Sequence, residues 1–489
     1  MDVDRESVFY TGVRRVKKPV RAVSGVLVVA VMTHPYPCPH GRCVYCPGGV
    51  REGTPQSYVE KSPAVLRAKQ HGFHPYLQTH ARLSQYVAMG HNPSKVEVIV
   101  MGGTFPAMPL DYQEWFIANV LEALNRFPKS SIPAKWIYLE DAMRRNEKAK
   151  VRCVGLTIET RPDWSKEKQI DRFLHLGATR IELGVQTIYD DVLRKIKRGH
   201  MVRDTIVATQ LLKDAAYKVA YHIMPGLPGS DLDRDLEMMR TLFDDSKFRP
   251  DMLKIYPTIV VPGTELYEWW KKGKYRSYTD EEIVEFLIKA LRIIPKYVRI
   301  MRIQRDIPLQ YVAAGVKIGN LREVVYREAL KRGIKPVEIR FREVGHYILR
   351  TGKTPAPENI KLTKLLYEAS GGWEVFLSFE DLKNDVLVGF LRLRIPSSEA
   401  HRREIDSRTA LVRELHVYGF QTPVGVKYDT SWQHRGYGRR LLKAAEDIAL
   451  NEFDCKRILV ISGVGVRDYY RKHGYRKVKG SFYMGKKLN

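Results

Sequence analysis

The chain has 489 residues, of which 44% are hydrophobic and 10% aromatic, enough for ordinary buried cores in more than one domain. Its five cysteines cannot form a disulfide framework, and its longest apolar run, near residues 25–32, is too short to span a bilayer. We therefore expect a cytoplasmic protein with no membrane partner. The formal net charge of +27 and the pI near 9.7 favour a polyanionic partner, above all a nucleic acid.

Two local stretches carry much of this basic character. Residues 14–21, RRVKKPVR, and residues 291–305, LRIIPKYVRIMRIQR, alternate bases with apolar or aromatic side chains and contain no acid. This pattern suits a phosphate backbone lying over a folded surface.

The first part of the chain alternates predicted strands with predicted helices. Six short, β-branched apolar segments predict strands at residues 24–33, 95–103, 153–163, 178–186, 217–229 and 252–260. Segments with helical spacing lie between them, such as residues 108–127 and 233–245. Near-continuous apolar strands alternating with helices imply a buried parallel sheet, here an α/β fold with a partial (β/α)6 barrel. Its functional loops should follow the carboxyl ends of the strands.

The pattern changes after about residue 313. A helical connector at residues 320–333 leads to predicted antiparallel strands at 373–380, 385–394 and 410–419, a helix at 435–450 and a strand at 457–464. This second part predicts an α+β domain. We divide the chain into a basic segment (1–21), a barrel domain (22–313), a connector (314–335) and the α+β domain (336–489).

Three of the five cysteines, Cys38, Cys43 and Cys46, lie within nine residues, directly after the first predicted strand. Cys153 and Cys455 fall in predicted strands and are expected to be core thiols. A structural zinc would need a fourth ligand, and only His34 or His40 is near enough in sequence. A cubane iron–sulfur cluster held by three thiolates would instead leave one iron open to a small molecule.

The C-x4-C-x2-C spacing with Tyr45 before the last cysteine resembles the cluster loop of radical S-adenosylmethionine (SAM) enzymes, whose common spacing is one residue shorter. Gly102, Gly103 and Thr104 match the family's Gly-Gly-Glu motif without its acid, and by that resemblance contact the methionine end of SAM. Glu159 and Gln186 end the next two predicted strands, where they either line the SAM pocket or cap helices. The resemblance implies a 4Fe–4S cluster on the three cysteines and a 5′-deoxyadenosyl radical made from SAM.

The second domain has its own cofactor signal. The residues QHRGYG, Gln433 to Gly438, open a predicted helix, where free backbone N–H groups can bind a pyrophosphate such as that of coenzyme A. The later YYRKHGY, Tyr469 to Tyr475, has the spacing seen in GCN5-related N-acetyltransferases (GNAT). We expect one of Tyr469 and Tyr470 to be catalytic beside the acetyl-CoA thioester and the other to pack in the core.

A radical SAM half joined to a GNAT half resembles the Elp3 family, the catalytic subunit of Elongator and its stand-alone relatives. The motifs CPHGRCVYCPGG, VMGGTFPAMP, ETRPDW, RIQRDIP, VRELHVYG and VISGVGVRDYYRKHGY carry the resemblance, from about Lys17 to the C-terminus. It implies an enzyme that uses acetyl-CoA and SAM to place a carboxymethyl-type group on C5 of uridine 34, in the anticodon stem-loop of tRNA. The electron donor is unknown, and a homodimer is one option for its assembly.

The same resemblance assigns acetyl-CoA contacts residue by residue. They are Lys95, Glu414, Leu415, His416, Val417, Gln433, His434, Gly436, Gly438 and Tyr470. Because Lys95 belongs to the barrel, acetyl-CoA would lie between the domains. Family members commonly carry a longer basic N-terminal extension, so either tRNA affinity here rests on the folded surface or the chain is truncated.

Three other functions remain as alternatives. A protein lysine acetyltransferase with a structural cluster is disfavoured, because the charge of +27 would repel basic peptide tails. An RNA-binding scaffold would not need the cysteines. A radical SAM methyltransferase would leave the acetyl-CoA domain without a role.

Overall fold

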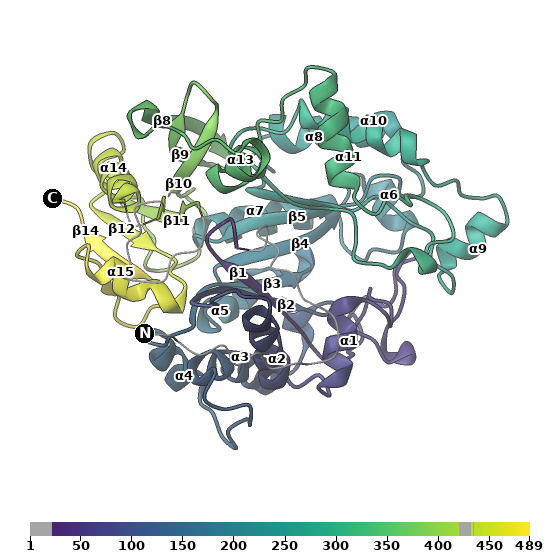
Figure 1. Ribbon diagram of the computed structural model, residues 1–489, viewed down its shortest axis with the longest axis horizontal. Helices are drawn as coiled ribbons and strands as arrows, with labels where there is room; N and C mark the ends of the chain where they lie inside the picture. The colour runs from purple at the N-terminus through teal and green to yellow at the C-terminus, as the bar shows by residue number, and fades with distance from the viewer. Residues whose placement is uncertain (1–21, 420–431, 434) are drawn as a thin grey trace, which may run out of the picture.

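The computed structural model describes residues 22–419, 432, 433 and 435–489. The described residues form two seven-stranded sheets with their helices, which lie side by side (Figure 1). The basic residues 14–21 and His434 lie outside the described residues. Among the helices that the structure describes, none has the length and hydrophobicity needed to cross a membrane.

The first sheet is wholly parallel, and its strands follow one another in chain order. They are β1 (Leu27–Met32), β2 (Lys95–Met101), β3 (Arg152–Thr160), β4 (Arg180–Gln186), β5 (Lys218–Ile223), β6 (Met252–Ile255) and β7 (Arg299–Ile303). The predicted partial barrel is confirmed. It stays open because β1 and β7 are the two edges of the sheet and do not pair with each other.

The seventh strand, β7, was not predicted, because residues 291–305 have the pattern of a basic surface stretch. In β7, Ile300 and Ile303 are buried, whereas Arg299 and Arg302 line the cavity inside the barrel. Four of the residues from 296 to 305 are bases, so the short apolar pattern of a strand was hidden.

Helices connect these strands and cover the outer face of the sheet (Figure 1). They are α1 (Pro63–Gln70), α2 (Pro75–Ala88), α3 (Leu110–Arg126), α4 (Leu139–Asn146), α5 (Glu167–His175), α6 (Asp190–Lys195), α7 (Val202–Asp214), α8 (Leu232–Asp244), α9 (Glu265–Lys271) and α10 (Asp280–Leu291). Apolar strand residues such as Leu27, Val29 and Val31 are fully buried in the core. Their burial fixes the register of β1 and leaves its alternate residues, Val28 and Ala30, facing the barrel interior.

The second sheet is mostly antiparallel, in the order β13-β14-β12-β11-β10-β9-β8. Its elements are β8 (Ile360–Ala369), β9 (Gly372–Asp381), β10 (Val386–Ile395), β11 (Thr409–Val417), α14 (Tyr437–Asn451), β12 (Arg457–Val460), α15 (Arg467–Arg471), β13 (Arg476–Lys477) and β14 (Met484–Lys487). Three of these strands, β8, β13 and β14, were not predicted from the sequence. Cys455 is buried as expected but precedes β12 instead of lying within it.

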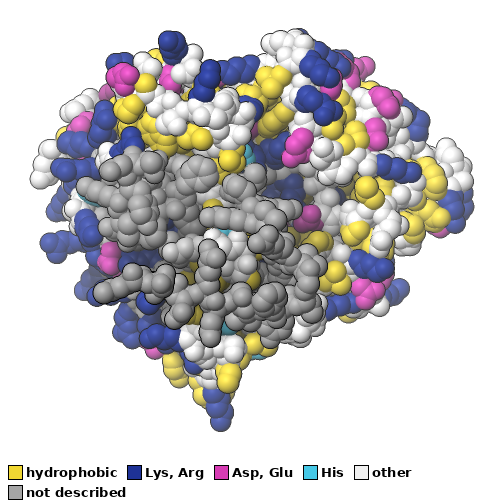
Figure 2. Space-filling view, viewed as in Figure 1, with side chains coloured by type: hydrophobic (Ala, Val, Ile, Leu, Met, Phe, Trp, Pro, Cys, Tyr) yellow, Lys and Arg dark blue, Asp and Glu magenta, His cyan; other side chains and the backbone are white. Residues whose placement is uncertain are grey.

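Three helices lie between the two sheets in the chain: α11 (Leu321–Lys331), α12 (Ile339–Arg342) and α13 (Val344–Thr351). The expected domain boundaries near residues 313 and 335 fall between β7, the last strand of the first sheet, and β8, the first strand of the second sheet in the chain. The visible face carries more dark-blue Lys and Arg than magenta Asp and Glu, notably along the edge formed by α14 and α15 (Figure 2).

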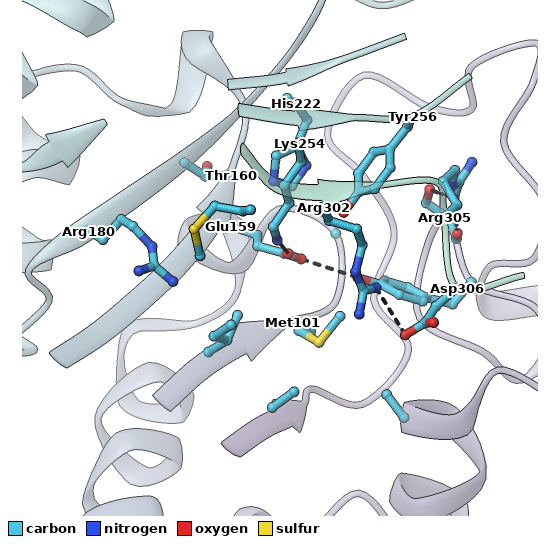
Figure 3. A pocket seen from close by; sticks show the side chains of 18 of the residues that line it. Met101, Glu159, Thr160, Arg180, His222, Lys254, Tyr256, Arg302, Arg305 and Asp306 are labelled. Carbon is cyan, nitrogen blue, oxygen red and sulfur yellow. Dashed lines mark hydrogen bonds and ion pairs between the residues drawn. The ribbon is translucent and has the colours of Figure 1, made fainter. Parts of the chain in front are cut away.

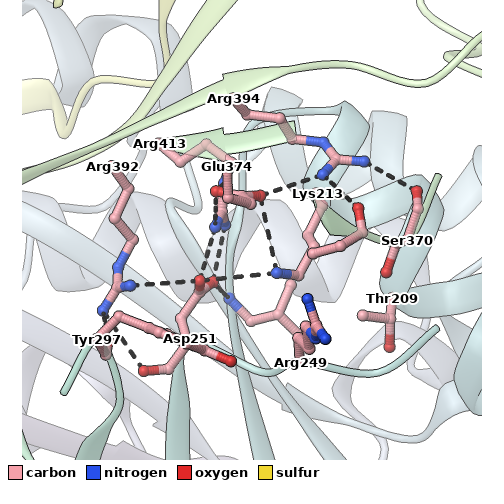
Figure 4. A network of polar contacts seen from close by, with 12 residues as sticks. Thr209, Lys213, Arg249, Asp251, Tyr297, Ser370, Glu374, Arg392, Arg394 and Arg413 are labelled. Atoms are coloured by element: carbon pink, nitrogen blue, oxygen red, sulfur yellow. Dashed lines mark hydrogen bonds and ion pairs between the residues drawn. The ribbon is translucent and has the colours of Figure 1, made fainter. Parts of the chain in front are cut away.

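A buried ion network joins the two domains (Figure 4). Asp251, just before β6, accepts hydrogen bonds from both Nη atoms of Arg413 in β11, at 2.6 and 2.7 Å. Arg413 also binds Glu374 of β9 at 2.8 Å. Arg394 of β10 binds Asp214 at the end of α7, at 2.7 Å between Nε and Oδ1. These contacts fix the second sheet against the C-terminal side of α7 and the start of β6.

Candidate functional site between the two sheets

The three clustered cysteines lie in the loop after β1, at the carboxyl edge of the first sheet. Cys43 and Cys46 are buried and Cys38 is half-buried, and all three line one cavity. Each sulfur has a polar neighbour: Thr104 Oγ1 lies 3.6 Å from Cys38, His40 Nε2 3.2 Å from Cys43, and Gln56 Nε2 donates to Cys46 at 3.3 Å. The loop therefore presents three thiols to the cavity.

The distances between these sulfurs distinguish a closed zinc site from an iron–sulfur cluster. Ligands of one tetrahedral zinc, at a Zn–S distance of about 2.3 Å, would lie about 3.8 Å apart. The three cysteine sulfurs do not all lie within 4.8 Å of one another, with or without His40 in the group. Cys153 and Cys455 bond to local carbonyls instead, those of Gly155 and Phe453. The donor set fits a larger centre held by three thiolates and does not fit a closed zinc.

Cations near the loop favour the thiolate forms that a metal centre requires. Burial raises the pKa of Cys38, and burial together with Cys43 raises that of Cys46 to about 11. Arg198 partly opposes this effect at Cys38, and Gln56 and Arg305 do so at Cys46. The Arg198 guanidinium is buried, lies 3.8 Å from the sulfur of Cys43 and donates to the carbonyl of Gly184 at 2.6 Å. Arg198 was not predicted from the sequence, because it lies in a loop after α6 and not at the end of a strand.

The predicted Gly-Gly-Thr motif follows β2, next to the cysteine loop. A Cβ on Gly102 would lie 2.1 Å from Thr33 Oγ1, and one on Gly103 would lie 3.3 Å from Gln56 and 3.7 Å from the sulfur of Cys38. Both glycines also have positive φ, so a side chain is excluded at each. Gly103 and Thr104 line the cavity, whereas Gly102 packs against Thr33.

The cavity has a volume of about 710 Å³ and extends from the cysteine loop, through the interior of the first sheet, to β11 of the second sheet. Glu159 and Gln186, predicted at strand ends, both line it. Gln186 has a φ of +71°, and its buried Oε1 has no partner among the described residues. A buried amide oxygen of this kind is available to a ligand.

A charged cluster crosses the interior of the sheet (Figure 3). Lys254 of β6 binds Glu159 at 2.9 Å and also Glu182, which His222 contacts at 2.9 Å. Burial alone would raise the pKa of Glu182, but Lys254, His222 and Arg180 hold it well below its ordinary value. Glu159, Glu182 and His222 have the spacing of a cation site, yet the Lys254 ammonium already supplies the positive charge. Lys254 is a second missed residue, although a lysine within a predicted apolar strand was a visible signal.

The residues of β11 that are predicted to contact acetyl-CoA lie beyond the point where the pairing of β11 with β12 ends. β11 pairs with β12 only from Thr409 to Val412, so the predicted Glu414, Leu415, His416 and Val417 have no β12 partner. Backbone groups on such an edge can bond a ligand amide. The register with β10 also shifts at Arg413, which places Arg413 and Glu414 on the same face of the sheet.

β11 therefore lies between two regions, the cavity of the first sheet on one face and the start of α14 on the other. Glu414, His416 and Tyr418 line the cavity of the first sheet. Val417 faces the other way, toward the start of α14, where a Cβ on Gly438 would lie 3.8 Å from its Cγ2. The same Cβ would lie only 2.8 Å from the hydroxyl of Tyr469.

The two candidate tyrosines differ in their surroundings. The Tyr469 hydroxyl is buried beside Gly438 and has no hydrogen-bond partner among the described residues, and burial raises its pKa to about 12. Tyr470 is 6% exposed and packs edge-on against Tyr475 in the core. Tyr469 is thus the tyrosine that faces the glycine-rich helix start.

Lys95 and Gln433 join the two domains at this point. Lys95 Nζ, at the start of β2, donates to Gln433 Oε1 at 2.6 Å, and Gln433 Nε2 donates to the carbonyl of Val417 at 3.1 Å. Burial lowers the pKa of Lys95 to about 8. Gly436, with a φ of +85°, begins α14 nearby and has open space where a Cβ would lie.

Comparisons with known proteins agree with this two-part site. Residues 33–242 match the radical SAM superfamily, residues 250–331 the radical SAM C-terminal domain, and residues 347–475 the acetyltransferase (GNAT) family. The chain is 54% identical over 476 residues to a tRNA uridine(34) acetyltransferase of Methanocaldococcus jannaschii, covering 96% of this chain and 86% of that protein. The chain belongs to the Elp3 family.

Two further comparisons support this Elp3 assignment. Elongator complex protein 3 of Homo sapiens is 44% identical over 471 residues, covering 94% of this chain and 84% of that protein. A solved structure of Methanocaldococcus infernus Elp3 with an N-terminal deletion superimposes with a TM-score of 0.83 at 50% identity, covering 95% of this chain and all of that chain. The predicted family and its two-part fold are confirmed.

Proposed function

We propose that this protein modifies C5 of uridine 34 in tRNA with a carboxymethyl-type group, using acetyl-CoA and a SAM-derived radical. The observation that carries the proposal is the single cavity that reaches from the three cysteines to β11 of the GNAT domain. Because Glu414 and His416 line this cavity on the unpaired end of β11, an acetyl group carried past that end of the strand would meet a radical formed at the cysteine loop. The names of the close relatives support the substrate. The cytoplasm is the expected location.

Cys38, Cys43 and Cys46 would hold a 4Fe–4S cluster, and Gly103, Thr104, Glu159 and Gln186 would contact SAM. When bound together with SAM, such a cluster supplies one-electron cleavage of the sulfonium to give a 5′-deoxyadenosyl radical. The Elp3 chain itself provides a partly enclosed cavity, which would limit the access of bulk water to the radical. Arg198 and Arg161 provide positive charge beside the thiolates.

On the GNAT side, the unpaired edge Glu414–Val417, Gln433, Gly436 and Gly438 would bind acetyl-CoA, with Lys95 contributing from the barrel. Tyr469 would act at the thioester, because its unpartnered hydroxyl lies at the start of α14. Tyr470 would support it from the core. Uracil C5 reacts poorly with ordinary electrophiles at neutral pH, so a radical route gives a reason for two cofactors in one chain.

The lysine acetyltransferase alternative fits the geometry less well. Such an enzyme would use the face of β11 toward α14 and would have no need of the cavity on the other face. That cavity is lined by ten basic and four acidic side chains of the described residues, which would repel a basic peptide.

The deciding experiment combines anaerobically reconstituted protein, dithionite, SAM, acetyl-CoA and unmodified tRNA. We expect mass spectrometry of the nucleoside digest to show a modified uridine that depends on both cofactors. Unmodified uridine from protein that still cleaves SAM and hydrolyses acetyl-CoA would defeat the proposal. Acetylation of lysine peptides at a rate above that of tRNA-dependent acetyl-CoA hydrolysis would favour the alternative.

A further inference from the structure

The charges that line the cavity do not balance. Each of its four acids already has a basic partner: Glu97 with Arg180, Glu159 with Lys254, Glu414 with Arg392, and Asp306 with Arg302. Arg299 pairs with Glu343, Arg161 pairs with Asp163, and Arg198 lies against the thiols. Within the described part of the chain, this leaves four cavity arginines without an ion pair to a carboxylate: Arg67, Arg82, Arg305 and Arg340.

These four arginines flank the open side of the first sheet, between its edge strands. Arg67 of α1 donates to the carbonyl of Ala30 in β1 at 2.8 Å. Arg82 of α2 donates to the Tyr86 hydroxyl at 3.1 Å, and that hydroxyl donates to the carbonyl of Val28 at 2.7 Å. Both guanidinium groups are thus fixed along the free edge of β1.

The other two arginines lie by the opposite edge of the sheet. Arg305, two residues beyond β7, donates to the carbonyl and hydroxyl of Ser57, at 2.5 and 2.7 Å. Arg340 lies on α12, which packs against β7. Its guanidinium forms no hydrogen bond or ion pair with any residue that the structure describes. Figure 3 shows Arg305 on this side of the cavity, beside the Arg302–Asp306 pair.

Burial makes the charged forms of Arg67 and Arg340 less favourable than in water. Burial, followed by repulsion from Arg82, lowers the pKa of Arg67 to about 10. Burial, with Arg322 and Arg299, lowers the pKa of Arg340 to about 10. Half-buried cations without an anion pay a desolvation penalty that a bound anion would offset. A matching anionic ligand is therefore the simplest reason for this arrangement.

We propose that Arg67, Arg82, Arg305 and Arg340 bind the phosphodiester groups that flank the target nucleotide, so that its base alone enters the cavity. The inference rests on the proposed function and adds the position at which the RNA enters the barrel. One guanidinium group can donate two parallel hydrogen bonds to the oxygens of one phosphate. A nucleobase reaches an enclosed site only when its nucleotide is unstacked from its neighbours.

The small cofactors account less well for these charges. The pyrophosphate of acetyl-CoA belongs, in the proposed function, to the start of α14 on the other face of β11. The carboxylate of SAM belongs beside the cysteine loop, where Arg161 and Arg198 already lie. The open edge between β1 and β7 is the part of the cavity left for a longer polyanion.

The test uses the full chain with its cluster reconstituted and a fluorescein-labelled anticodon stem-loop as the probe. Binding is measured by anisotropy over a series of KCl concentrations for Arg67→Ala, Arg82→Ala and Arg340→Ala. Arg144→Ala serves as the matched control, because Arg144 is 79% exposed on α4 and does not line the cavity. Acetyl-CoA affinity and the cluster absorbance are measured on the same samples.

We expect each cavity variant to bind the stem-loop about fivefold more weakly at low salt, with a salt slope shallower by about 0.7 for each lost phosphate contact. The control, the acetyl-CoA affinity and the cluster absorbance should not change. If Arg67→Ala does not fold, Arg67→Lys replaces it. This variant keeps the positive charge and should keep most of the salt dependence of RNA binding. The loss of a phosphate contact is then tested by Arg340→Ala.

Unchanged slopes in the cavity variants would overturn the inference, as would a loss of acetyl-CoA affinity without a loss of RNA affinity. Because the readout is binding, it is independent of turnover. If the stem-loop binds through these arginines but the activity assay yields no modified uridine, the proposed function is contradicted and the phosphate-binding site is still supported.

Discussion

Arg413 of the second sheet and Asp251 of the first domain form a fully buried, two-pronged ion pair, with N–O distances of 2.6 and 2.7 Å. The register shift at Arg413 makes the pair possible, because it turns this side chain and that of Glu414 to the same face of β11. This contact belongs to the buried network that joins the domains, and the adjacent residue, Glu414, lines the cavity. The relative position of the two cofactor regions depends on this network.

Asp251→Ala should strongly destabilise the protein. The substitution leaves Arg413 with Glu374 as its remaining carboxylate. Lys213 and Arg392 lose the carboxylate oxygen 3.8 and 3.7 Å away. Removing one partner of a buried pair typically costs about 3–5 kcal/mol. Urea denaturation should show the loss as a lower midpoint. Asp454→Ala is the control, since Asp454 forms only exposed ion pairs, with Arg408 and Lys456. Equal midpoints for the two variants would contradict this reading of the network.

Replacing any one of Cys38, Cys43 and Cys46 by alanine should abolish cluster assembly, because two thiolates cannot hold the centre. Iron content and visible absorbance after anaerobic reconstitution measure the effect. Cys153→Ala should keep its iron, as the Cys153 sulfur is buried in β3 and bonds to the carbonyl of Gly155. Purification with stoichiometric zinc and no iron would refute the three-thiolate assignment.

Tyr469→Phe should lower tRNA-dependent acetyl-CoA hydrolysis by at least about 100-fold, as expected when a group that transfers a proton is removed. Its stability should be unchanged or higher, because the substitution removes a buried hydroxyl that has no partner among the described residues. Tyr470→Phe keeps the ring that packs on Tyr475 and should retain most of the activity. Thermal unfolding and a hydrolysis assay separate the two roles. The reverse ranking of activities would move the catalytic assignment to Tyr470.

Acetyl-CoA affinity should depend on pH through Lys95. Burial lowers the pKa of Lys95 to about 8, so its ammonium is charged below that pH and increasingly neutral above it. A charged Lys95 favours the phosphates of acetyl-CoA, and the affinity should fall about fivefold between pH 8 and 9. Isothermal titration calorimetry checks this. Lys95→Arg stays charged and should remove the dependence, and an identical pH profile in that variant would assign the titration to another group.

Several residues of the candidate site were predictable because their signals are local. The cysteine spacing, the Gly-Gly pair after β2 and the glycines that begin α14 are all short-range patterns. Glu159 and Gln186 were found because polar residues at the ends of apolar strands stand out. Arg198 and Arg67 have no such signal, since each lies on a separate loop or helix and meets its partners only through the fold.

The sequence by itself determined the order and type of most elements, the three-thiol loop and the family, because hydrophobic periodicity and short motifs are properties of neighbouring residues. Only the tertiary structure decided that β7 forms one edge of the sheet, that Tyr469 rather than Tyr470 faces α14, and that β11 separates the cavity from the start of α14. The reason is physical: which face a strand residue occupies depends on its register against a strand far away in sequence, and one bulge at Arg413 is enough to change it.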